Sequence, residues 1–403
     1  MNFETNESSF YFFYSTLFAI ITLRGAKKFK ATTTPTKTIT LPDVIGSTPL
    51  LYLPRLSAMF GIRVFGKAEY FNPGGSVKDR AALFMIQSAV RSGELKPGGL
   101  VVEGTGGNTG VALSMICASL GYKCYLTMPT NVSLEKQLTM KAFGATIELC
   151  DTKFGVSDAG HYTQRAKAVA KERGGVHTDQ FYNLANSTSH SSQTAPELVS
   201  QLCSLNISDY IFATGAGTGG TISGVAKHLG HLSEKPPVVL VDFEGSGMKA
   251  YLKTGQFTKA PGNTEAEGVG ISRLTRNFAS GFKHIDGSVS VSDIEVAKMC
   301  RYLAEEEGVW VGPSASGNVV GAVKAGLREK QERGEGGEEV TVVTILCDSG
   351  ASYLSKMYNK EWREGVGLGD AGTLGRGDLD LELNGGFVPR GEDSLFEGHV
   401  GGG

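Results

Sequence analysis

The order of apolar and amphipathic segments is the feature that most restricts how this chain can fold. Between Thr38 and about Arg363, short apolar runs alternate with stretches in which hydrophobic residues recur at helical spacing. Such alternation predicts parallel strands joined by helices that cover both faces of a sheet. At 403 residues the chain is long enough for two domains. We therefore expect an α/β protein with open parallel sheets.

Individual strands and helices can be placed from the same pattern. The predicted strands are Leu100–Glu103, Lys123–Met128, Ala145–Leu149, Asp209–Ala213, Val238–Val241 and Val340–Leu346. The predicted helices include Arg80–Arg91, Val111–Leu120 and Leu134–Phe143. Several of the strands end directly at glycine-rich loops, which is where ligands bind in open α/β sheets.

Both ends of the chain depart from this pattern. Residues 10–23 (FYFFYSTLFAIITL) are apolar and are followed by basic residues, but a transmembrane helix needs about 20 apolar residues. For residues 1–37 a short membrane anchor, a disordered leader and a mistaken start codon remain open. Glycine is frequent after residue 365 and apolar periodicity is lost, so we expect residues 365–403 to be disordered.

Charge and cysteine placement exclude several classes of function. The chain has 39 basic and 41 acidic residues, so it offers no broad basic field for nucleic acid. Its six cysteines are scattered without C-x-x-C spacing, and no histidine pairs with them at metal-ligand distance. We therefore expect no nucleic-acid partner, no structural metal, and reduced thiols in a reducing compartment.

The segment Asn72-Pro-Gly-Gly-Ser-Val-Lys78-Asp-Arg80 places a lysine where a glycine turn leads into a helix. Glycines allow the backbone to approach a ligand closely. A lysine that is buried in a pocket has a lowered pKa and can form a Schiff base with a carbonyl group. On this segment alone, a surface lysine on an ordinary turn remains the alternative.

A second candidate loop, Glu103-Gly-Thr105-Gly-Gly-Asn108-Thr109-Gly110, connects a predicted strand with a predicted helix. The N–H groups at the start of the helix favour a carboxylate or a phosphate. Thr105, Asn108 and Thr109 add side-chain donors. A plain glycine-rich turn explains this segment equally well on its own.

A third loop, Gly215-Ala-Gly217-Thr218-Gly219-Gly220-Thr221-Ile-Ser-Gly224, follows the predicted strand that ends at Ala213. Its consecutive N–H groups can surround a phosphate, and the hydroxyls of Thr218 and Thr221 can assist. The loop lacks the Gly-Lys-Ser/Thr ending of a Walker A motif and the downstream acid of a dinucleotide site. A phosphate that is not part of a nucleotide therefore fits it best, with a structural turn as the alternative.

A lysine, a carboxylate-binding loop and a phosphate loop together describe pyridoxal phosphate bound to an amino acid. The sequence resembles the cysteine synthase (O-acetylserine sulfhydrylase) family, which also includes the cystathionine β-synthase core. The resemblance runs from Ile45 to Gly350. Its markers are the segments Lys67–Arg80 and Asn108–Gly110, Asp179-Gln180-Phe181 with Asn183–Asn186, and Gly217–Thr221. The endings Cys347-Asp-Ser-Gly and Asn359-Lys-Glu-Trp362 resemble the fungal branch described as mitochondrial cysteine synthase-like.

This resemblance implies a fold-type II pyridoxal-phosphate enzyme of the tryptophan synthase β kind, with the cofactor between two α/β domains. The large, phosphate-binding domain would comprise residues 38–71 and 183–364. The small, mobile substrate-loop domain would comprise residues 72–182. A homodimer is implied as well.

The resemblance also implies roles for individual residues. Lys78 would carry pyridoxal 5'-phosphate as a Schiff base and would remove the Cα proton. Asn108 would bind the ring hydroxyl of the cofactor, and Ser314 would be the neutral partner of the ring nitrogen, with Ser316 as a competing candidate. The phosphate would be held by Gly217, Thr218, Gly219, Gly220 and Thr221, and the substrate by Thr105, Gly106, Gly107, Asn108, Thr109 and Gln180.

Two segments depart from the pattern of the family. Many relatives have Thr-Ser-Gly-Asn-Thr in the substrate loop, whereas Gly106 stands here in place of the serine and removes one carboxylate-binding hydroxyl. Relatives usually carry Ala-His-Tyr and Thr-Gly-Pro-Glu further on. This chain keeps His190 and Glu197 but has Ser191 and Ala195. We expect such changes to affect affinity or substrate choice.

The implied reaction converts O-acetyl-L-serine and hydrogen sulfide into L-cysteine and acetate through an aminoacrylate intermediate. Alternatives are a cysteine desulfhydrase, a serine/thiol β-replacement enzyme like cystathionine synthase, and a membrane-anchored regulatory protein without turnover. The expected partners are a small amino acid and sulfide. The expected location is mitochondrial, with anchoring in the outer membrane through residues 10–23, and the cytoplasm is the alternative.

Overall fold

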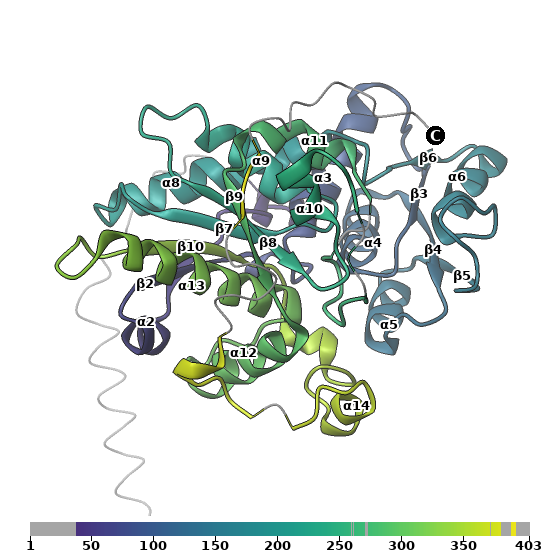
Figure 1. Ribbon diagram of the computed structural model, residues 1–403. Helices are drawn as coiled ribbons and strands as arrows, with labels where there is room; N and C mark the ends of the chain where they lie inside the picture. The colour runs from purple at the N-terminus through teal and green to yellow at the C-terminus, as the bar shows by residue number, and fades with distance from the viewer. Residues whose placement is uncertain are drawn as a thin grey trace, which may run out of the picture. The chain divides into compact units, whose positions relative to one another are not determined.

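Two β-sheets organise the described part of the chain (Figure 1). The computed structural model describes residues 38–258, 260, 262–270, 273–370, 372–379 and 388–391. Nearly all of them belong to one compact unit, Leu41–Gly403, and the other unit is Met1–Thr40. The description below concerns the first of these units.

The larger sheet has seven strands in the order β1-β2-β10-β7-β8-β9-β11. Its inner strands are parallel, and the two edge strands, β1 and β11, pair antiparallel with β2 and β9. The strands are β1 (Leu50–Tyr52), β2 (Arg63–Ala68), β7 (Ile211–Gly215), β8 (Val238–Phe243), β9 (Gly287–Val291), β10 (Thr341–Leu346) and β11 (Val388–Pro389). The inner strands β8 and β10 are buried along their whole length and rich in valine, as expected for a parallel sheet that is covered on both faces.

The smaller sheet has four parallel strands in the order β5-β4-β3-β6. They are β3 (Leu100–Gly104), β4 (Lys123–Pro129), β5 (Thr146–Cys150) and β6 (Val176–His177). The two sheets therefore take their strands from different stretches of sequence. The domain limits expected at residues 72, 183 and 364 stay a prediction.

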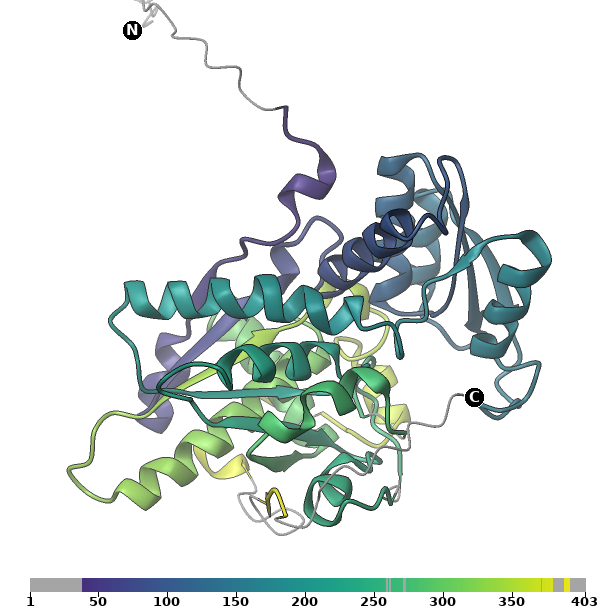
Figure 2. The same cartoon turned by 90° about the horizontal axis from the view of Figure 1, so that it is seen from above.

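Helices cover both faces of each sheet, and Figures 1 and 2 show these layers from two directions. Against one face of the larger sheet pack α2 (Pro54–Phe60), α12 (Asp293–Glu305) and α13 (Pro313–Arg333). Against its other face pack α8 (Ala195–Ser204), α9 (Gly220–Leu229), α10 (Met248–Thr254) and α11 (Arg276–Gly281). The smaller sheet packs against α3 (Lys78–Arg91), α4 (Asn108–Leu120) and α5 (Leu134–Ala142) on one face and α6 (Tyr162–Arg173) on the other.

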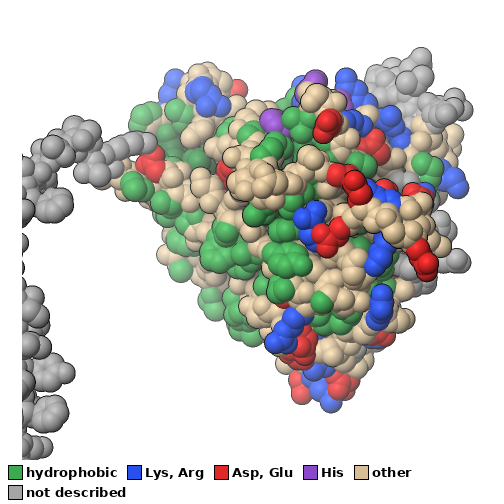
Figure 3. Space-filling view, turned by 90° about the vertical axis from the view of Figure 1, so that its left-hand side faces the viewer, with side chains coloured by type: hydrophobic (Ala, Val, Ile, Leu, Met, Phe, Trp, Pro, Cys, Tyr) green, Lys and Arg blue, Asp and Glu red, His purple; other side chains and the backbone are tan. Residues whose placement is uncertain are grey.

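Short helical segments complete the unit. They are η1 (Leu41–Val44), η2 (Glu69–Phe71), α7 (Ala185–Ser189), the π-helical turn η3 (His190–Thr194), η4 (Phe282–His284), η5 (Gly350–Tyr353), α14 (Lys360–Gly365) and η6 (Arg376–Asp378). On the face drawn in Figure 3, basic and acidic side chains are interspersed, in keeping with the nearly balanced charge of the chain.

The predicted alternation of strands and helices is confirmed. Each strand and helix placed from the sequence is present, with small differences at the ends. The largest difference is at α4, which begins at Asn108 whereas the apolar pattern predicted a start at Val111. The cause is that Asn108 and Thr109 are polar and follow glycines, yet they already form the first turn of the helix. This turn therefore adds their side chains to the loop that precedes it.

The prediction of a wholly disordered tail is wrong for part of residues 365–403. Leu374 and Leu379 are buried in the core cluster that includes α12 and α13. Asp378 accepts a bond from Lys298 of α12 at 2.5 Å, and Val388–Pro389 forms β11 beside β9. Glycine-rich sequence hid these contacts because the leucines that make them are few and far apart. Residues 371, 380–387 and 392–403 lie outside the described residues.

The apolar run 10–23 lies outside the described residues as well. Within the described ranges, no helix is both long and apolar enough to cross a bilayer.

A buried ion network joins the start of α3 to the rest of the unit. The guanidinium of Arg80, with no exposed surface, binds Glu69 through Nε at 2.7 Å and Glu197 through Nη1 and Nη2 at 2.7 Å each. Lys67, also fully buried, donates to Glu197 at 2.8 Å and to the Thr48 carbonyl at 2.6 Å. Each buried charge thus has charged partners, which offsets the cost of removing it from water.

We predict that Glu197→Gln lowers the free energy of unfolding by about 3 kcal/mol at pH 7, because it leaves Lys67 and Arg80 underpaired. Burial opposes ionisation of Glu197, but Arg80 and Lys67 hold its pKa at about 2. Its stabilising effect is therefore complete above the ordinary pKa of 4.5 and declines as the pH falls toward 2. Urea unfolding at several pH values measures both effects, and the variant should lose less stability than the wild type between pH 4.5 and 2.

Glu332→Gln is the matched control, because its carboxylate pairs with Arg328 on the surface with 55% of the side chain exposed. The control should cost less than about 0.5 kcal/mol. Equal losses in the two variants would show that the buried network adds nothing beyond a surface pair.

Candidate active site

Loops that follow the carboxyl ends of strands in both sheets line one cavity of about 540 Å³. The loops after β2, β7 and β10 come from the larger sheet, and those after β3, β4 and β6 from the smaller one. This edge is where open parallel sheets bind ligands. Every predicted site residue except Gly220 lines the cavity: Lys78, Thr105, Gly106, Gly107, Asn108, Thr109, Gln180, Gly217, Thr218, Gly219, Thr221 and Ser314. Gly220 is the first residue of α9 and does not line the cavity.

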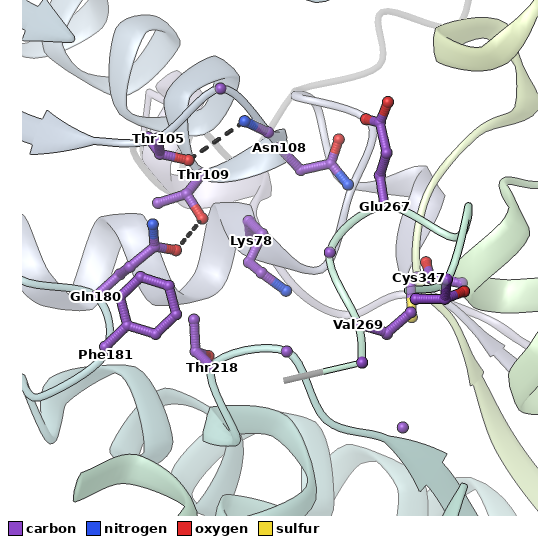
Figure 4. A pocket seen from close by; sticks show the side chains of 18 of the residues that line it. Lys78, Thr105, Asn108, Thr109, Gln180, Phe181, Thr218, Glu267, Val269 and Cys347 are labelled. Atoms are coloured by element: carbon purple, nitrogen blue, oxygen red, sulfur yellow. Dashed lines mark hydrogen bonds between the residues drawn. The ribbon is translucent and has the colours of Figure 1, made fainter. Parts of the chain in front are cut away.

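Lys78 is the first residue of α3, at the end of the Pro-Gly-Gly turn. Two hydrogen bonds fix this turn. Val77 N–H donates to the Cys347 carbonyl at 2.8 Å, and Gly74 N–H donates to the Asp79 carboxylate at 2.5 Å. In Figure 4 the half-buried Lys78 side chain extends from α3 into the cavity. The lysine therefore leaves a backbone that is held in place, with its amine directed at any ligand in the cavity.

The loop after β3 and the loop after β6 are joined by side chains. Thr109 Oγ1 donates to Gln180 Oε1 at 2.7 Å (Figure 4). Gln180 N–H in turn donates to the Glu103 carboxylate at 3.1 Å, and Thr178 Oγ1 donates to the same oxygen at 2.5 Å. Burial raises the pKa of Glu103, which these donors partly offset. Thr105, Thr109 and Gln180 thus face the cavity together, as the binding of a carboxylate requires.

At Gly217, the loop after β7 packs too closely against its neighbour for a side chain. A Cβ on Gly217 would lie 1.9 Å from the carbonyl oxygen of Gly268, a distance that no real Cβ adopts. Asn186 Nδ2 donates to Thr218 Oγ1 at 2.9 Å and fixes that side chain. Because the first N–H groups of a helix have no partner within it, the start of α9 can bind an anion.

His190 contacts this loop through the Thr221 hydroxyl. Its Nε2 lies 3.3 Å from Thr221 Oγ1, and its Nδ1 lies 2.9 Å from Thr194 Oγ1. Burial, together with the positive charges of Arg80 and Lys78, lowers the pKa of His190 well below its ordinary value. The imidazole is therefore neutral at pH 7, and it orients the Thr221 hydroxyl without adding charge.

The two serines proposed as partners of a ring nitrogen differ in position. Ser314 lines the cavity and is buried, and its Oγ lies 3.5 Å from Asp348 Oδ1. Ser316 is fully buried away from the cavity and donates to the Gly312 carbonyl within α13 at 3.2 Å. Position thus favours Ser314 over Ser316.

Gly106, the departure noted in the substrate loop, has a neighbour that explains it. A Cβ at Gly106 would lie 2.1 Å from Cγ2 of Val132, which comes from the loop after β4. Val132 also lines the cavity. A valine methyl therefore occupies the space that a serine side chain at position 106 would need.

Sequence reasoning missed several residues of the cavity wall. Glu267, Lys356 and Arg273 line it, and the guanidinium of Arg273 lies 4.3 Å from the ring centre of Phe181. None of them is part of a motif, and they reach the cavity only through the folding of distant segments. Cys347 also lines it. The Cys347-Asp348 pair was noted only as a mark of family resemblance.

The chain matches the family described as "Pyridoxal-phosphate dependent enzyme" over residues 41–348. It is 36% identical to cysteine synthase 1 of Neurospora crassa, over 80% of this chain and 84% of that protein. It is 37% identical to cysteine synthase 1 of Emericella nidulans, over 82% and 87% of the two chains. A Saccharomyces cerevisiae protein named "Putative mitochondrial cysteine synthase" is 37% identical, over 84% and 88%.

Among solved structures, the chain is similar to O-ureido-L-serine synthase, with a TM-score of 0.69 and 31% identity. The match covers 82% of this chain and 96% of that one. The chain therefore shares its fold with an enzyme of known structure.

The cavity fits pyridoxal phosphate. The cavity is lined by the Lys78 side chain, by the glycine-rich loop at the start of α9 and by the buried Ser314. Because Gly217 lies so close to Gly268, the loop presents backbone and no side chain at this position, and backbone N–H groups are what would bind a phosphate. These are the groups that the cofactor requires: a Schiff-base lysine, an anion site and a partner for the ring nitrogen.

We predict that Gly217→Ala weakens pyridoxal phosphate binding at least about tenfold, because the added methyl group must push the loop away from Gly268. Titration of the cofactor-free protein with pyridoxal phosphate measures the change. Gly365→Ala in α14 is the control, since nothing lies within 4 Å of its added Cβ. An unchanged affinity in Gly217→Ala would remove this loop from the cofactor site.

Proposed function

Because the chain belongs to the pyridoxal-phosphate dependent enzyme family, we propose that it joins O-acetyl-L-serine and hydrogen sulfide to form L-cysteine and acetate. The observation that carries the proposal is the convergence of Lys78, the Thr105–Thr109 loop and the Gly217–Thr221 loop on one cavity. The similarity to fungal proteins named cysteine synthase supports the choice of reaction.

Lys78 is proposed as the residue that holds the cofactor and moves the proton. When bound, pyridoxal phosphate withdraws electrons from the Cα of an amino acid, so that its proton and its β-substituent can leave. The amine of Lys78 would take the Cα proton, since it projects into the cavity from a fixed backbone. The phosphate would lie on the N–H groups of the Gly217–Thr221 loop.

The substrate carboxylate is proposed to lie on the loop after β3. Thr105 and Thr109 offer hydroxyls, and the start of α4 offers backbone N–H groups. Gln180 adds an amide that is held by its bonds to Thr109 and Glu103. Since these groups come from the smaller sheet and the phosphate loop from the larger, a bound substrate would draw the two together and exclude water.

Ser314 is proposed as the partner of the ring nitrogen. A neutral hydroxyl there does not keep the nitrogen protonated as an aspartate would, which favours elimination at Cβ over transamination or racemisation. Support comes from its position in the cavity wall.

We also propose that the enzyme acts as a homodimer in mitochondria. The resemblance to the cysteine synthase family supports the dimer. The name of the yeast relative supports the location.

The first test is to incubate the purified protein with O-acetyl-L-serine and sulfide and to measure cysteine and acetate. We expect both products, and we expect Lys78→Ala to lose them while it still binds pyridoxal phosphate without a covalent bond. Borohydride reduction followed by peptide mass spectrometry should place the cofactor on Lys78. Lys227→Ala, in the last turn of α9, is the control.

Serine and cysteine serve as alternative substrates in the same assay. Turnover of one of these with no cysteine from O-acetyl-L-serine and sulfide would contradict the proposed reaction. A cofactor reduced onto a different lysine would contradict the role of Lys78.

The close approach of Gly106 to Val132 can be tested by substitution. We expect Gly106→Ser to raise the KM for O-acetyl-L-serine about tenfold, because the new Cβ overlaps Val132. Adding Val132→Ala should restore most of the affinity, because the serine then has room to bind the carboxylate. Steady-state kinetics of both variants and of Val132→Ala alone check this. A double variant as impaired as Gly106→Ser would show that Val132 is not what excludes the serine.

A further inference from the structure

Asp348 is a buried residue two positions after the end of β10, next to the cavity-lining residue Cys347. Its Oδ2 accepts a bond from Asn108 Nδ2 at 2.6 Å and another from Tyr353 Oη at 2.6 Å. The side chain is 1% exposed. Neither the family match nor the candidate motifs give this carboxylate a role, although it touches the residue proposed to bind the cofactor's ring hydroxyl.

We propose that Asp348 is a positioning residue that fixes the orientation of the Asn108 amide. An asparagine amide can exchange its oxygen and nitrogen by rotating about one bond, and only its hydrogen bonds decide between the two orientations. Rotation in this site would place the Asn108 oxygen against a carboxylate oxygen. Asp348 therefore decides how the nitrogen and the oxygen of the Asn108 amide are presented to the ring hydroxyl.

The carboxylate is itself held by a chain of side chains that reaches α5 of the smaller sheet. Lys136 Nζ donates to Tyr353 Oη at 3.3 Å and lies 4.3 Å from the centre of the Tyr353 ring. Because the tyrosine hydroxyl accepts from Lys136, its own hydrogen is directed at Asp348. Lys136, although charged, is 2% exposed, so this contact is part of the packed interior.

Glu267, which lines the cavity, is linked to the same series of side chains. It forms an ion pair with Lys136 and a second one with Lys356 at 2.6 Å. Burial opposes its ionisation, but the two lysines outweigh this and lower the pKa of Glu267. The adjacent Gly268 is the residue whose carbonyl approaches the phosphate loop. Asp348 thus belongs to a network with contacts to α5, to the cavity mouth and to the substrate loop.

This inference rests on the proposed role of Asn108, so the experiment separates the two. Cofactor-free protein is titrated with pyridoxal phosphate, and the dissociation constant and the absorption maximum of the bound cofactor are measured. The variants are Asn108→Ala, Asp348→Asn and Tyr353→Phe. Tyr358→Phe is the matched control, because the hydroxyl of this half-buried tyrosine donates to the Val311 carbonyl at 2.6 Å. Thermal unfolding of each variant reports folding.

We expect Asp348→Asn to weaken cofactor binding about tenfold and to shift the absorption maximum, since a charged hydrogen-bond partner is lost. Tyr353→Phe should shift both in the same direction by less, and Tyr358→Phe should leave both unchanged. If Asn108→Ala is impaired while Asp348→Asn and Tyr353→Phe match the wild type, the positioning role is overturned and the role of Asn108 survives. If Asn108→Ala itself matches the wild type, both assignments fail.

Discussion

The pairing of Arg80 with Glu69 and Glu197 is the interaction on which the active site depends most. Arg80 lies two residues after Lys78 in the first turn of α3 and has no exposed surface. A guanidinium in such a position must be paired with charge in a fixed geometry, since an unpaired buried charge costs several kcal/mol. The carboxylate of Glu69 comes from η2, just before α3, whereas that of Glu197 comes from α8, which is 117 residues away in sequence. The positions of these two carboxylates therefore fix the start of α3, and with it the backbone from which the Lys78 side chain extends.

Much of the fold could be predicted because its information is local. The inner strands β7, β8 and β10 are short runs of mostly apolar residues, and the helices placed from the sequence have hydrophobic residues at helical spacing. The strands that were not predicted are β1, β2, β6, β9 and β11. Polar residues and glycines interrupt the apolar pattern of the inner strands β2 and β9, and the other three strands are short. β6 has two residues and β11 pairs with β9 across about 100 positions, so pairing and not propensity defines them. The same limit hid Leu374 and Leu379, whose burial depends on α12.

The site divides in the same way. Lys78, Asn108 and the Gly217–Thr221 loop stand out in the sequence because glycines and polar residues interrupt apolar patterns at strand ends. Glu267, Tyr353 and Lys136 have no such signal: each is an ordinary residue that becomes part of the site when three distant segments meet. Gly106 shows an intermediate case, because its departure was visible in the sequence, whereas the reason for it, Val132, required the structure.

This division has a mechanical consequence for the enzyme. The residues that the sequence reveals are those that would touch cofactor or substrate, and they sit on loops of both sheets. The sequence does not reveal the hydrogen bonds that connect those loops, such as the bond of Thr109 to Gln180 and that of Asn108 to Asp348. The second of these bonds links the start of α4 in the smaller sheet to the end of β10 in the larger. Any movement that brings substrate carboxylate and cofactor phosphate together must therefore preserve or remake it. On this geometry, the closure of the cavity is coupled to the orientation of the Asn108 amide.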